Sequence, residues 1–156
     1  MNAPRVAPAT DQRRIVRLNF GRAWTALAAA LALHVADEAL TDFLSVYNPA
    51  VRAMRARFPW LPLPTFSFQE WIAGLAALIV FLFALSPFAF RGVRWMAVMA
   101  IPFSVLMIAN GLGHIGSSIY MGRLMPGVYS SPVLIAASVF ALVCALRLFR
   151  GPHEKA

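Results

Sequence analysis

The amino-acid sequence predicts an all-α, polytopic membrane protein, a bundle of four transmembrane helices. Of its 156 residues, 60% are hydrophobic and 13% are charged, and the mean hydropathy is +0.69. A soluble domain of this length has too little interior to bury so much apolar surface. The apolar residues also form long runs, separated by short basic or proline-containing segments. We therefore expect much of the apolar surface to face lipid.

Four of these runs are long enough to be membrane helices. A helix needs ~20 mostly apolar residues to cross a bilayer. The first run reaches that length only with its polar second half, so ionisable side chains are expected within the membrane. Pro102, in the third run, is expected to bend its helix. The predicted spans are residues 21–47, 66–88, 93–120 and 132–149.

The predicted organisation is one membrane domain, residues 20–150, between two polar tails. Residues 1–19 are rich in arginine and proline and are expected to be a disordered, basic, cytoplasmic tail, and residues 151–156 a second cytoplasmic tail. Between the first two spans, Pro49 is expected to begin a short helix with apolar residues on one face and arginines on another. This pattern is typical of a helix lying at the membrane surface.

The basic residues predict the orientation of the bundle. Of the 14 Lys and Arg residues, ten flank the side that holds both termini and four flank the other side. Both termini are therefore expected in the cytoplasm. The formal net charge is +8, and the basic residues lie at the ends of the apolar runs. They form no basic patch interleaved with exposed aromatics. A nucleic-acid partner is accordingly not expected.

Two other features of the sequence have simple interpretations. Residues 23–33 resemble the apolar core of a secretory signal, and Ala30-Leu31-Ala32 resembles a cleavage site. The long preceding tail and the polar residues that follow favour a retained membrane helix. Cys144, the single cysteine, lies in an apolar run and is expected to be a buried, inert thiol.

Polar residues inside the predicted spans are the strongest functional signal. Four of the six acidic residues fall in membrane helices, where a charge costs ~2.5–3.5 kcal/mol at the bilayer centre. His34 and Glu38 are one helical turn apart, as are Asn110 and His114. A helix rises ~1.5 Å per residue, so counting from the cytoplasmic helix ends places both pairs in the outer half of the membrane. Glu70, near the start of the second span, is expected in the same half.

These residues support two kinds of chemistry. Two imidazoles and a carboxylate from His34, Glu38 and His114 suit a divalent metal such as Zn or Fe. The same groups, removed from water, suit proton exchange with a substrate. Simpler roles also remain open. His34 and Glu38 satisfy each other if they form a structural hydrogen bond, and Glu70 is favoured by the helix dipole as a solvated first-turn carboxylate.

The segment His34-Val35-Ala36-Asp37-Glu38 resembles the signature of the HXXEE family of small bacterial and archaeal membrane proteins. The chain has Asp37 where the motif has its first glutamate, and the shorter side chain favours a positioning role over direct ligation. Asn110, His114, Tyr120 and Pro126-Gly127 resemble a second block of the family. The resemblance implies four or five helices and an enzymatic site without an assigned reaction. The expected location is the cell inner membrane, with both termini in the cytoplasm.

The leading functional hypothesis is a membrane-embedded enzyme with hydrolase or isomerase chemistry. It would act on a lipid-like or isoprenoid-like substrate that reaches an outward-facing pocket from the side. Asp37 would hold His34 in one tautomer. The alternatives are a small transporter or proton-coupled carrier, and an accessory membrane subunit. The candidate site residues are His34, Asp37, Glu38, Glu70, Asn110 and His114.

Overall fold

The computed structural model describes residues 9–150, so the expected tails at residues 1–8 and 151–156 lie outside the described chain. The prediction of an all-α fold is confirmed, because the described residues form helices and no strand. The helices are α1 (Ala9–Leu40), α2 (Phe43–Arg57), α3 (Phe68–Ala84), α4 (Ser86–Arg91), α5 (Arg94–Met121) and α6 (Ser131–Arg150).

The four predicted spans are present. Within residues 9–150, four helical stretches are long and apolar enough to cross a membrane: Asp11–Leu40, Phe68–Arg91, Arg94–Met121 and Ser131–Arg150. The second stretch changes from α3 to α4 at Leu85, just before Pro87, which lacks the amide hydrogen of a continuous helix. Helix α5 runs on through Pro102.

The first helix begins earlier than the sequence analysis predicted. Residues 9–19 form the start of α1, so the prediction of disorder is wrong for this segment. Asp11 lies in the first turn, where a carboxylate interacts favourably with the helix dipole. The aliphatic part of Arg17 packs on the turn after α4, because a Cβ built on Gly92 would lie 2.5 Å from Arg17 Cγ. Tertiary contact thus extends a helix that composition alone does not favour.

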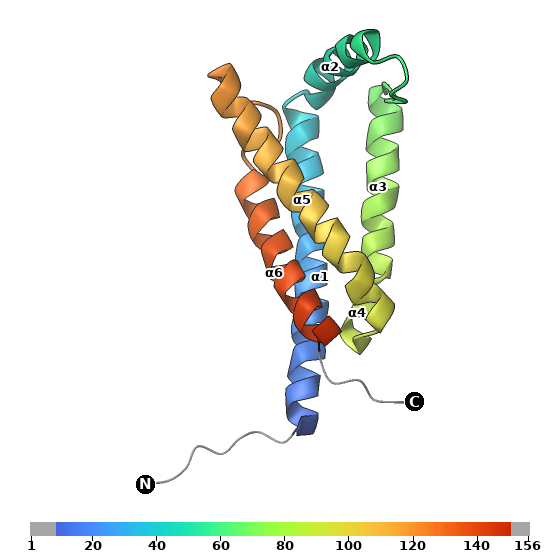
Figure 1. Cartoon of the computed structure of the whole chain (residues 1–156), viewed down its shortest axis with the longest axis vertical. Coiled ribbons are helices and arrows are strands. Elements are labelled where there is room, and N and C mark those ends of the chain that lie inside the picture. The colour runs from blue at the N-terminus through green and yellow to red at the C-terminus, as the bar shows by residue number, and fades with distance from the viewer. Residues whose placement is uncertain (1–8, 151–156) are drawn as a thin grey trace.

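The first helix also ends earlier than predicted. It stops at Leu40, and Asp42 takes a left-handed conformation with φ of 57°. Helix α2 then crosses the end of the bundle as the expected surface helix, with Pro49 inside it rather than at its start (Figure 1). Asn48 ties α2 to the segment before α3 through two hydrogen bonds with the Phe66 backbone, of 2.9 and 3.1 Å.

Helix α1 is the centre of the bundle. It packs against α6, α4 and α3, and α5 packs mainly against α6 (Figure 1). In α1, 50% of the most apolar 18-residue segment is buried, compared with 11% of the corresponding segment of the α3–α4 stretch. The core contains Phe20, Trp24 and Leu27, and Trp24 Nε1 donates a hydrogen bond to the Leu82 carbonyl at 2.9 Å. Two polar side chains of α1, His34 and Glu38, are buried by these neighbours.

The glycines of α5 do not share one role. Gly111 permits close helix packing, because an added Cβ would lie 2.7 Å from Ile135 on α6. At Gly113 and Gly116 an added Cβ would meet no atom within 4 Å, so close packing within the described chain does not explain these two. Their faces of the helix are open.

Candidate metal site

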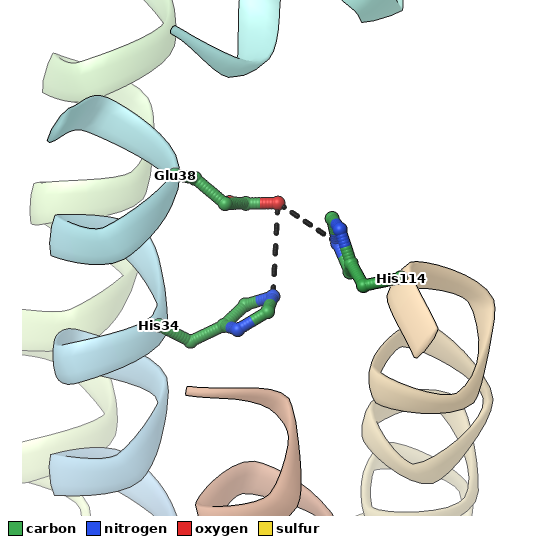
Figure 2. A group of neighbouring side chains, drawn as sticks. All are labelled: His34, Glu38 and His114. Carbon is green, nitrogen blue, oxygen red and sulfur yellow. Dashed lines mark ion pairs between the residues drawn. The ribbon is translucent and has the colours of Figure 1, made fainter. Parts of the chain in front are cut away.

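His34, Glu38 and His114 form one group near the C-terminal ends of α1 and α5. His34 and Glu38 lie on one face of α1, and both are buried. Glu38 Oε1 is 3.6 Å from His34 Nε2 and 3.1 Å from His114 Nε2. Figure 2 shows the three side chains directed toward a common centre from two facing helices. Three potential metal-ligating atoms lie within 4.8 Å of one another.

The hydrogen bonds around His34 assign its tautomer. Its Nδ1 lies 2.9 Å from Ser130 Oγ. The Ser130 hydroxyl has two acceptors for its single proton, Asp37 Oδ2 at 2.7 Å and the Gly127 carbonyl at 3.3 Å. The hydroxyl oxygen therefore accepts a hydrogen bond from His34 Nδ1–H. It follows that neutral His34 carries a lone pair on Nε2, directed at Glu38 and His114.

The same reasoning applies to His114. Its Nδ1 contacts the Pro126 carbonyl oxygen, which is only an acceptor, so Nδ1 carries the hydrogen. The Nε2 atom of neutral His114 then also presents a lone pair to Glu38. A metal-ligating histidine typically donates its other ring N–H to a carboxylate or a backbone carbonyl, which orients the ring. His114 has such a partner in the Pro126 carbonyl, and His34 is linked to the Asp37 carboxylate through the Ser130 hydroxyl.

The inner atoms of the group, Oε1 of Glu38 and Nε2 of each histidine, are arranged so that a cation between them would be stabilised. Two imidazole lone pairs and a carboxylate oxygen repel one another at these distances unless a positive charge lies between them. One proton shared by His114 and Glu38 satisfies that pair only. His34 Nε2 then makes no close hydrogen bond, with Glu38 Oε1 at 3.6 Å and the Asn110 side chain beside the ring, although the residue is 0% exposed. A metal ion satisfies all three atoms.

Asp37 has the positioning role that the sequence predicted, but it acts through Ser130. Its Oδ2 accepts hydrogen bonds from the Ser130 backbone N–H at 2.9 Å and from the Ser130 hydroxyl at 2.7 Å. Asp37 thus orients the hydroxyl that in turn orients the His34 ring. The aspartate at the first acidic position of the motif therefore lies outside the group of three ligating atoms.

Gly127 lets the loop between α5 and α6 reach the histidines. Its φ is +81°, and a Cβ at this position would lie 2.9 Å from His114 and 3.0 Å from His34. Only glycine combines this backbone conformation with such a close approach. The Pro126-Gly127 segment therefore contributes its backbone to the site, with the Pro126 carbonyl on His114 and the Gly127 carbonyl on Ser130.

Asn110 lies beside His34, one turn before His114 on α5. Its side-chain oxygen is buried, and its side chain interacts with His34. Asn110 and His114 both line a cavity of about 240 Å³, whose other walls include Phe43, Gly113 and Met125. Asn110 thus presents a polar atom next to an otherwise largely apolar cavity, as expected of a residue that orients a ligand.

Glu70 does not join the group. It is the third residue of a capping box, where it accepts hydrogen bonds from the Ser67 backbone N–H at 2.9 Å and hydroxyl at 2.8 Å. Its side chain is exposed and lies on a second cavity, beyond Phe43. The candidate assignment of Glu70 to the site is therefore corrected in favour of helix capping, which satisfies its charge locally. Asp42, four residues after Glu38, is the turn residue before α2.

Ser130 is the site residue that the sequence analysis missed. A serine just before a helix is ordinary for its capping preference, so the sequence offers no signal of a second role. Its contact with His34 joins residues 96 positions apart. Only the folding of the loop onto α1 brings them together.

Comparison with known proteins identifies one family. A search of curated proteins and a search of solved structures each found no match to the chain. The profile of a family described as "Protein of unknown function with HXXEE motif" matches residues 24–141, more than half of the 156 residues. The matched region contains both histidines, Glu38, Asp37 and Ser130. The chain therefore belongs to the HXXEE family, as the motif at residues 34–38 predicted.

Proposed function

We propose that this protein is a membrane-embedded, metal-dependent enzyme that hydrolyses a lipid-like substrate. The observation that carries the proposal is the hydrogen-bonded arrangement of the two histidines. Each donates its Nδ1–H to an outer acceptor, and each directs Nε2 at one carboxylate oxygen. The three acceptor atoms are Nε2 of the two histidines and Oε1 of Glu38, and hydrogen bonds at Nδ1 orient both rings. This arrangement suits a divalent cation better than a single proton.

The three ligands limit the metal ions that would suit the site. Two imidazoles and one carboxylate occur in catalytic zinc sites and in non-haem Fe(II) sites, and both types keep positions open for water or substrate. A zinc ion with Zn–N distances of ~2.0–2.1 Å holds two nitrogens at most ~4 Å apart. The three ligating atoms lie within 4.8 Å, so binding requires the rings to move by less than about 1 Å.

Such a metal would activate a water molecule for attack on an ester, amide or phosphoester bond. The water would add across the bond, with the hydroxyl going to the carbonyl or phosphorus centre and the proton to the leaving group. Asn110 supports this scheme, because its buried side chain lies beside His34 and lines the cavity. It would orient the polar part of the substrate.

The proposed location is the outer half of a cell membrane, with both termini in the cytoplasm. The distribution of Lys and Arg, ten against four, supports this orientation. The inner half of the buried α1 face is apolar and includes Phe20, Leu27 and Leu31. A proton relay across the membrane needs polar groups on both sides of His34, so this apolar stretch favours an enzyme pocket open to one side over a proton-coupled carrier.

The test is the metal content of the purified, full-length protein. Elemental analysis of the wild type in detergent should give about one zinc or iron per chain. His34→Ala and His114→Ala should lose this metal, whereas Glu70→Gln should keep it, because Glu70 caps α3 and lies outside the group. A wild-type preparation that is folded, active on lipid esters and free of metal overturns the metal proposal in favour of acid–base chemistry by the same residues.

A further inference from the structure

We propose that an apolar slot between α3 and α5, divided by Phe43, binds one hydrocarbon chain of a membrane amphiphile. The slot leads from the lipid-facing side of α3 to His114. This inference rests on the proposed function, since it specifies how the substrate of that site is held. The ligand is a single extended hydrocarbon chain, and its polar end lies toward Asn110 and His114.

Two cavities meet at Phe43. The first, about 240 Å³, contains Asn110 and His114 in its wall. The second, about 300 Å³, is lined by Tyr47, Trp71 and other residues of α2 and α3. Phe43 lines both. Ligand pockets typically measure ~300–1,000 Å³, so each cavity alone is at or below the lower limit, whereas the two together fall within the range.

Phe43 lies between His114 of the candidate site and Trp71 of α3. Its ring centroid is 5.9 Å from that of His114 and 5.9 Å from that of Trp71. It is the first residue of α2, directly after Asp42 with its left-handed backbone. Phe43 thus separates the two cavities that it lines, and the aromatic ring of Trp71 on the α3 side suits hydrocarbon.

Helix packing leaves this side of the bundle open to lipid. Helix α3 packs mainly on α1, and the main contacts of α5 are with α6. In Figure 1, α5 begins beside α4 and leans away from α3 toward the end that α2 crosses. The cavities lie at that end, because their walls include residues of α2. A chain from the surrounding bilayer therefore reaches the slot without crossing water.

The glycines of the slot provide an independent observation. Gly74 lies in the wall of the α3 cavity and Gly113 in the wall of the His114 cavity. A Cβ at either position would meet no atom within 4 Å, so close helix packing does not explain these glycines. Each helix pays for such a glycine in conformational entropy. Room for a ligand chain accounts for both.

The experiment uses photo-crosslinking in nanodiscs made of phosphatidylcholine. The probe is a long-chain fatty acid with a diazirine within the first few carbons after its carboxylate, and mass spectrometry measures labelling of the peptide that contains Phe43. Gly74→Leu and Gly113→Leu fill the slot, and leucine favours a helix, so both variants should fold. Gly116→Leu is the matched control, because Gly116 is one turn along α5, equally open, and absent from both cavity walls.

Labelling should fall about tenfold in the two slot variants, which corresponds to about 1.4 kcal/mol, and should stay within about twofold in Gly116→Leu. Unlabelled palmitate should compete with the probe, whereas octanoate should compete about tenfold more weakly. All three variants should keep the metal content of the wild type. Unchanged labelling in Gly113→Leu, or an equal loss in Gly116→Leu, overturns the slot. A wild type without metal but with this labelling pattern refutes the metal enzyme and leaves the slot intact.

Discussion

Removal of the Ser130 hydroxyl tests the assignment of the His34 tautomer. In the wild type this hydroxyl accepts from His34 Nδ1 at 2.9 Å and donates to Asp37 at 2.7 Å. Ser130→Ala leaves the Nδ1–H group without a partner at a fully buried residue. Asp37 keeps its bond from the Ser130 backbone N–H at 2.9 Å. The substitution therefore acts mainly on His34.

The expected magnitude follows from these contacts. An unsatisfied buried N–H group costs ~1–3 kcal/mol. For a chain of this length, ~1 kcal/mol lowers the melting temperature by about 2–4 °C. Loss of an outer partner of a metal-ligating histidine typically weakens metal binding ~10–100-fold. The physical reason is that the ring proton of His34 becomes free to move to Nε2, where it hydrogen-bonds Glu38 and blocks the metal.

The assay measures zinc affinity by competition with a chromogenic chelator and stability by intrinsic fluorescence of the detergent-purified protein. Ser138→Ala is the matched control. Ser138 is also 0% exposed, lies on α6, and donates only to the Leu134 carbonyl of its own helix, at 2.7 Å. It should destabilise by less than about 1 kcal/mol. It should leave zinc affinity unchanged.

Equal zinc affinities for Ser130→Ala, Ser138→Ala and the wild type would refute the tautomer assignment, and with it the main support for the metal site. A drop in stability alone, without a change in affinity, would reduce Ser130 to a structural hydrogen bond.

Three other predictions test the site and the topology. Gly127→Ala should lower both stability and metal content, because φ is +81° and the new Cβ would lie 2.9 Å from the His114 ring; a thermal melt as stable as that of the wild type contradicts this. Glu70→Gln should lower the melting temperature by weakening the α3 cap, while the zinc affinity stays that of the wild type. Loss of zinc binding in this variant would show that Glu70 belongs to the site. Reporters inserted after Gly92 should report the cytoplasm and after Leu61 the outer compartment, and the reverse pattern would invert the proposed orientation.

The fold was largely predictable because a bilayer imposes strong constraints on sequence. Every spanning segment needs about 20 apolar residues, so four spans could be located from composition and length. Helix ends were harder to predict. The start of α1 depends on Arg17 packing against the turn at Gly92, and its end depends on a left-handed Asp42. Neither a distant contact nor a positive φ at aspartate has a reliable local signal.

The sequence alone determined which residues belong to the candidate group. His34, Glu38 and His114 are costly in a membrane, repeat at helical spacing and lie at matching depths, so their convergence follows from helix geometry. Only the tertiary structure decided the remaining roles. Glu70 has matching depth, yet its local capping contact with Ser67 satisfies it away from the group. Ser130 has no distinguishing local pattern, and it reaches His34 because Gly127 allows the loop to fold against both imidazole rings. Depth and periodicity are local properties of a helix, whereas the pairing of a loop hydroxyl with a ring nitrogen depends on how the helices pack.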